Sequence, residues 1–185
     1  MFARTQRLML RPGWIEDAPE LSRAIGHHEV IRNLARAPWP YALGDAQAFL
    51  MRERAADDLP VFLICALEKG ASRIVGCIGL DRGEADAAEL GYWLTPDAWG
   101  RGYATEAGAA VVDIARTLRV RQLTAGHFVD NPASGRVLRK LGFQPTGRTV
   151  PRHSLGRGGE DQMVEFAQSL SQPGCGDDPW DRLAA

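Results

Sequence analysis

The sequence predicts a mixed α/β domain, and two stretches of the chain lead to that prediction. Three apolar runs with short connections, expected as strands over 61–67, 73–80 and 87–95, are typical of an antiparallel meander. A glycine-containing loop, a helix and a further strand over 123–128 follow the third run. A strand, a helix and a second strand in this order give parallel pairing. One sheet should therefore contain both antiparallel and parallel neighbours.

The remaining elements follow from apolar periodicity and from residues that begin or end helices. Leu8 and Leu10 share one face of a first strand, which Pro12 ends. Asn131 is a suitable N-cap, and Pro132 suits the first helical position. The other predicted strands are 4–11, 143–150 and 162–166, and the predicted helices are 16–25, 30–36, 45–56, 104–118 and 132–141.

Length and composition limit the classes of protein to consider. Residues 1–170 suit one domain, and residues 171–185 are expected to be a flexible tail rich in Pro, Gly and Asp. The net charge is −1, from 22 basic and 23 acidic residues, which argues against a general nucleic-acid binder. Cys65 and Cys77 lie in apolar runs and should be buried, and adjacent His27-His28 rarely share one metal ion. We expect a cytoplasmic protein without a metal or a membrane span.

The stretch from Trp99 to Ala107 places two glycines around Arg101 and then begins a helix. The first turn of a helix has free backbone N–H groups and the positive end of the helix dipole, so it suits a phosphate. Glycine lets the backbone approach the anion without a Cβ in the way. No Gly-Lys-Ser/Thr or G-x-G-x-x-G accompanies the loop. The loop alone therefore indicates either an anion site or close packing.

Three blocks in this order resemble the GCN5-related N-acetyltransferase (GNAT) superfamily, and specifically its RimJ/RimL-type branch. They are Ala88-Glu89-Leu90-Gly91-Tyr92-Trp93-Leu94, the Trp99 to Ala107 loop and the Asn131 to Phe143 segment. The opening Thr5 to Arg11 also looks like that branch's first strand, so the resemblance covers about residues 4–168. It implies a twisted mixed sheet of about six or seven strands, with helices on both faces and two central parallel strands that splay apart.

The resemblance also implies acetyl-CoA as the cosubstrate and assigns residues to its binding. Backbone amides of the glycine loop would hold the pyrophosphate, and strand backbone before the loop would pair with the pantetheine amides. Trp99 occupies the loop's first place, which looks usual for this branch. The implied binding residues are Trp93, Leu94, Thr95, Trp99, Gly100, Arg101, Gly102, Tyr103, Ala104, Thr105, Asn131 and Ser134.

The chemistry implied is direct attack of a neutral amine on the thioester, with a thiolate leaving. Glu89 is the candidate base by resemblance, although a surface carboxylate in an ion pair is the alternative. Many members of the superfamily use a tyrosine acid at the place where this chain has Leu138. The RimL-type alternative is Ser134, which could instead satisfy free amides at the helix start. Asn131 fits both the N-cap and a pantetheine contact.

The sequence leaves the acceptor amine open, between a protein N-terminus and a small molecule. An α-amine has a pKa near ~8 and a lysine side chain near ~10.4, so a single exposed Glu base suits the α-amine better. A non-catalytic coenzyme A sensor on the same fold is the alternative function. A nucleotide-phosphate binder would need Mg²⁺ ligands that the sequence does not present. Oligomeric state is open.

Overall fold

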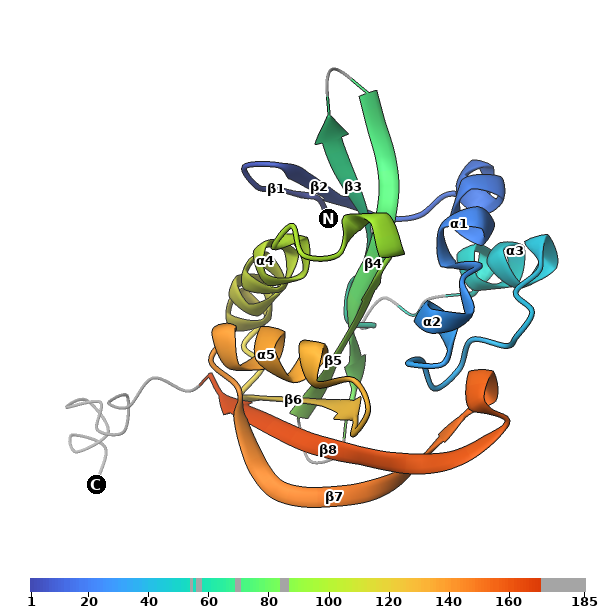
Figure 1. The fold of residues 1–185 in the computed structure, drawn as a ribbon. Coiled ribbons are helices and arrows are strands. Elements are labelled where there is room, and N and C mark those ends of the chain that lie inside the picture. The colour runs from blue at the N-terminus through green and yellow to red at the C-terminus, as the bar shows by residue number, and fades with distance from the viewer. Residues whose placement is uncertain (54, 56–57, 69–70, 84–86, 171–185) are drawn as a thin grey trace, which may run out of the picture.

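The computed structural model describes residues 1–53, 55, 58–68, 71–83 and 87–170. Its strands form one mixed sheet of eight strands within those residues, in the order β1-β2-β3-β4-β5-β6-β8-β7 (Figure 1). The strands are β1 (Ala3–Arg4), β2 (Leu8–Arg11), β3 (Val61–Glu68), β4 (Ala71–Arg82), β5 (Ala87–Leu94), β6 (Gln122–Phe128), β7 (Gln144–Ser154) and β8 (Gly159–Ser169).

Helices cover both faces of this sheet, as the resemblance implies. In Figure 1, α4 and α5 lie on one side of β4 and β5, and α1, α2 and α3 lie on the other. The helices are α1 (Ala18–Ile25), α2 (His28–Ile31), α3 (Leu43–Met51), α4 (Tyr103–Thr117) and α5 (Pro132–Lys140). In the described part of the chain, no helix combines the length and apolar character needed to cross a bilayer.

Several predicted elements have other bounds in the structure. The helix expected over 30–36 is α2 and ends at Ile31, because Asn33 N and Leu34 N donate to carbonyls three residues back rather than four. The strand expected over 4–11 is a hairpin, because Thr5 N donates to Leu8 O (2.9 Å) and turns the chain between β1 and β2. This extra strand is one reason why the sheet exceeds the predicted six or seven strands. The helix expected over 45–56 ends at Met51, where the backbone of Arg52 leaves helical geometry (ψ 120°). The predicted tail lies outside the described residues, as do residues 69 and 70 in the short connection between the first two runs of the meander.

The meander and the parallel pair are confirmed. β3, β4 and β5 pair antiparallel in sequence order, and β5 pairs parallel with β6. That parallel pairing covers three positions and ends at Glu89 opposite Thr124. Beyond it, β5 stays on β4 as far as Leu94 and β6 stays on β8 as far as Phe128. The two central strands therefore separate from Glu89 onward, as the resemblance implies.

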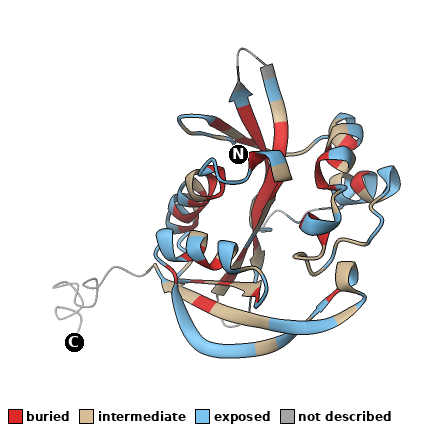
Figure 2. Cartoon of the chain, in the orientation of Figure 1, coloured by how far each residue is buried: buried red, intermediate tan, exposed pale blue. Residues whose placement is uncertain are grey.

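Alternation along β5 assigns its side chains to two layers. Ala88 and Leu90 pack into the main core with α4, whereas Trp93 packs against residues of α1 and α2. Cys65 and Cys77 are buried, as predicted. Figure 2 shows burial concentrated along β3 to β5 and the inner side of α4, while β7 is mostly exposed. The separation of β5 from β6 thus adjoins the best-packed part of the molecule.

Candidate active site

The glycine loop has the backbone geometry that an anion site needs. Gly100 and Gly102 adopt left-handed conformations (φ 72° and 79°), which L side chains rarely adopt. Gly102 is the N-cap of α4, and no side chain caps it. No heavy atom of the described chain lies within 4 Å of an added Cβ at Gly100. Two left-handed glycines directly before the first turn of α4 therefore fit the close approach of a pyrophosphate.

An ion pair that the sequence did not reveal braces this loop. Glu106, in the first turn of α4, accepts from Thr5 Oγ1 (2.6 Å), Arg7 N (2.8 Å) and Arg7 Nε (2.7 Å). Arg7 Nη1 in turn donates to the carbonyl of Arg101 (2.9 Å). Burial alone would raise the pKa of Glu106, but the Thr5 and Arg7 donors lower it below its ordinary 4.5. Hydrogen bonds from the β1–β2 turn thus fix the position of the glycine loop.

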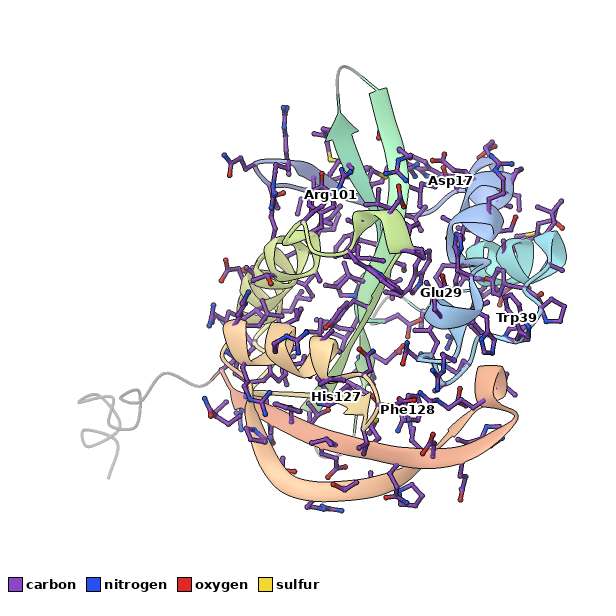
Figure 3. All side chains as sticks on the ribbon, viewed as in Figure 1. Asp17, Glu29, Trp39, Arg101, His127 and Phe128 are labelled. Carbon is purple, nitrogen blue, oxygen red and sulfur yellow. The ribbon has the colours of Figure 1, made fainter. Side chains whose placement is uncertain are left out.

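Trp99 fastens the loop to the end of β5. Its indole Nε1 donates to Leu94 O (2.9 Å), and Thr95 N donates to Val75 O (2.8 Å). Two backbone groups that the resemblance assigned to pantetheine are therefore engaged within the protein. The side chains of Tyr103 and Ala104 are buried, so these two residues can offer a ligand only their backbone. Figure 3 shows Arg101 at the loop, well apart from Glu29 and Trp39 on the α2 side.

Asn131 is the N-cap of α5, as predicted, with its Oδ1 accepting from Ser134 N at 3.4 Å. Because Asn131 does the capping, the Ser134 hydroxyl remains available for another contact. It lies 2.8 Å from the hydroxyl of Tyr92, a residue that we did not predict in the site. Leu138, where a tyrosine acid was considered, is fully buried in the core. Strand alternation could have indicated Tyr92, since it shares the face of Leu90.

Glu89 lies at the last paired position of β5 and β6, and it is engaged by an arginine. Arg152 Nη2 donates to both Glu89 oxygens, at 2.9 and 3.0 Å. The two side chains are 37% and 42% exposed, so solvent screens the pair and its net contribution is about 0–1 kcal/mol. Asp81, opposite Glu89 on β4, is similarly paired with Arg36.

The two candidate catalytic side chains lie on opposite faces of the sheet. Tyr92, and with it the Ser134 hydroxyl, is on the α4–α5 face. Glu89 is an odd number of residues from Tyr92 along β5, so it shares the other face with Trp93. Glu89 and Ser134 thus flank the separated strands from opposite faces.

The long β7–β8 hairpin borders the sheet face that carries Glu89. Its 3₁₀ turn, Leu155–Arg157, meets the segment after α2 through Leu155 N to Ala35 O (3.0 Å) and Arg157 Nε to Arg32 O (2.6 Å). Arg157 also pairs with Asp130, next to Asn131 (2.7 Å). A hollow of about 360 Å³ between these elements is lined by His28, Arg32, Gly156, Arg157, Glu160 and Asp161.

Across the described ranges, no group of three or more His, Cys, Asp or Glu residues could hold a metal ion.

This fold and loop define the chain as a coenzyme A-dependent acyltransferase. The sequence model of the acetyltransferase (GNAT) domain matches residues 7–144, and the chain belongs to that family. It is an acetyl-CoA-dependent acetyltransferase. An uncharacterized N-acetyltransferase of Bacillus subtilis (strain 168), YoaA, is 30% identical over 156 residues, covering 77% of this chain and 82% of that protein.

Solved structures share the fold across nearly the whole domain. The ribosomal-protein-S5-alanine acetyltransferase from Vibrio fischeri has a TM-score of 0.77 at 16% identity, covering 93% of this chain and 98% of the other. RimL, a ribosomal L7/L12 α-N-protein acetyltransferase in complex with coenzyme A, has a TM-score of 0.75 at 19% identity, covering 92% and 98%. At these identities, the neighbours show that this chain has the same fold.

Proposed function

We propose that the protein transfers the acetyl group of acetyl-CoA directly to a primary amine, in a ternary complex. The observation that carries this proposal is the arrangement around the separated strands. Glu89 lies where β5 and β6 part, and Ser134 lies beside β5 on the opposite face. An amine can therefore approach on the Glu89 face while the thiolate leaves on the Ser134 face.

The coenzyme would be held by the residues predicted for it. The glycine loop at the start of α4 would suit the pyrophosphate, and Asn131 and Ser134 would flank the pantetheine arm. When bound, acetyl-CoA supplies an activated acyl group with a good leaving thiolate. Glu89 would take the proton of the attacking amine, and the Ser134 hydroxyl would donate a hydrogen bond to the developing thiolate.

For the acceptor, we infer an α-amine or a small-molecule amine of similar basicity. An α-amine with a pKa near ~8 is about one-tenth neutral at pH 7, whereas a lysine at ~10.4 is almost wholly protonated. Glu89 is 37% exposed, with its oxygens shared with Arg152, and such a base suits an amine that is already partly neutral. Thiol release from acetyl-CoA across N-terminal peptides, amino acids and small amines tests this choice.

Glu89→Gln tests the base. Turnover should fall by ~10²–10⁴ at pH 7, with acetyl-CoA binding kept, and the loss should shrink at high pH, where the amine deprotonates unaided. Glu165→Gln is a matched control, because it neutralises a partly exposed carboxylate of β8 that is paired with Arg148 of β7. Arg152→Gln separates base from ion pair. If Arg152→Gln lowers turnover as much as Glu89→Gln does, the activity depends on the ion pair rather than on proton transfer to Glu89.

A further inference from the structure

The Tyr92–Ser134 contact has no part in the chemistry proposed so far. The Tyr92 hydroxyl lies 2.8 Å from Ser134 Oγ and 3.4 Å from Ser134 O. Tyr92 comes from β5, three residues beyond the point where that strand leaves β6, and Ser134 comes from the first turn of α5. The contact therefore joins the two elements that flank the separated strands.

A serine hydroxyl has one proton and two lone pairs, so it can donate to one partner while it accepts from another. If Ser134 donated its proton to Tyr92, that proton would not be available to a departing sulfur. If Tyr92 donates to Ser134 Oγ instead, the serine proton is free to turn elsewhere. Hydroxyl protons rotate readily, so the arrangement depends on which of the two hydroxyls is the stronger donor.

Of the two hydroxyls, the phenol of Tyr92 is the stronger hydrogen-bond donor and the weaker acceptor, so Tyr92 is the donor in this contact. Burial raises the pKa of Tyr92 to about 12, although the hydrogen bond with Ser134 acts in the opposite direction. A free thiol has a pKa near ~8.5, so complete transfer of the tyrosine proton to a thiolate would be unfavourable by more than ~10³-fold. At neutral pH the Tyr92 hydroxyl is thus a steady donor rather than an acid.

We propose that Tyr92 is a positioning residue for acetyl transfer, whose hydroxyl donates to Ser134 Oγ and so directs the Ser134 proton toward the leaving sulfur. The inference rests on the proposed role of Ser134. In the step itself, the amine nitrogen forms the new C–N bond and the C–S bond breaks with its electron pair going to sulfur. Glu89 takes the amine proton, and the thiolate, stabilised by Ser134, is protonated from solvent. Tyr92 and Ser134 are unchanged at the end.

The test compares steady-state kinetics of Tyr92→Phe, Ser134→Ala and the double variant. Tyr92→Phe should lower kcat by ~10-fold, the worth of one hydrogen bond, with the KM for acetyl-CoA within about twofold. The double variant should turn over no more slowly than Ser134→Ala, because both changes act on one hydrogen-bonded unit. Ser154→Ala is the control, since it removes a buried hydroxyl that donates to Leu34 O at 2.7 Å. It should lower the melting temperature and leave kcat unchanged.

Other results would overturn the inference in distinguishable ways. If the two losses multiply in the double variant, Tyr92 acts independently of Ser134. If Tyr92→Phe lowers only the melting temperature while Ser134→Ala lowers kcat, Tyr92 merely packs and the proposed function stands. If Ser134→Ala keeps full kcat, both the proposed role of Ser134 as hydrogen-bond donor to the thiolate and this inference fail.

A second measurement serves if Tyr92→Phe does not fold. The chain has 3 tyrosines, and all can be replaced by 3-fluorotyrosine, whose hydroxyl is a stronger donor. The replacement should change kcat in the wild-type chain and not in Ser134→Ala. An equal change in both proteins would overturn the inference.

Discussion

The Arg7–Glu106 pair offers a prediction that can be worked out from the structure. Glu106→Gln keeps the shape of the side chain and one oxygen for Thr5 Oγ1 and Arg7 N, the two donors that now bind Oε1. It replaces the oxygen that faces the guanidinium by an NH₂ group, so donor meets donor where Arg7 now lies 2.7 Å from Oε2. The substitution therefore removes the charged part of the contact and little else.

The size of the expected loss of stability follows from how exposed the Glu106 and Arg7 side chains are. A hydrogen bond to a charged group contributes about 1.5–3 kcal/mol when well shielded, and an exposed ion pair about 0–1 kcal/mol. Glu106 is 16% exposed and Arg7 is 45% exposed, so the loss should lie between these limits, at about 1–2 kcal/mol. For a domain of this size that lowers the melting temperature by about 3–6 °C.

The lowered pKa of Glu106 determines how its contribution to stability changes with pH. The pKa of Glu106 is below its ordinary 4.5 in the folded protein, so its stabilisation is present above pH 4.5 and is lost as pH falls through the folded-state value. Urea unfolding at pH 7, 5.5 and 4 should show a gap between wild type and Glu106→Gln that narrows only in the most acidic sample. Asp113→Asn is the control on the same helix, because its pair with Arg116 is 73% and 51% exposed and should contribute little. A gap that stays constant down to pH 4, or a control that matches it, would refute the reasoning.

Two further predictions concern the coenzyme loop and a buried tyrosine. Gly102→Glu should abolish acetyl-CoA binding in calorimetry, because it adds a side chain at φ 79° and a negative charge at the phosphate site. The control is Gly44→Glu, which lies in open space on α3 and should bind acetyl-CoA normally. Unchanged affinity in a folded Gly102→Glu protein would contradict the loop assignment. Burial raises the pKa of Tyr41 to about 12, so its contribution to stability is full below pH 10 and falls between pH 10 and 12. Tyr41→Phe should make urea midpoints fall less steeply over that range, and parallel curves for the two proteins would contradict this.

Local patterns in the sequence determined most of the fold. The meander, the helix after the glycine loop and the Asn131 cap were predictable because each depends on residues within a few positions of one another. The glycines of the loop were expected to let the backbone approach an anion, but the left-handed conformations of Gly100 and Gly102 were found only in the structure.

The contacts that complete the site were decided by tertiary structure alone. Arg7 and Glu106 are 99 residues apart in the chain, Glu89 and Arg152 are 63 apart, and Tyr92 and Ser134 are 42 apart. No local periodicity encodes such pairs, because each depends on how the hairpin, the sheet and the helices pack together. Glu89 was recognisable as a candidate base from its block, but its arginine partner appeared only when the β7–β8 hairpin brought Arg152 beside the separated strands.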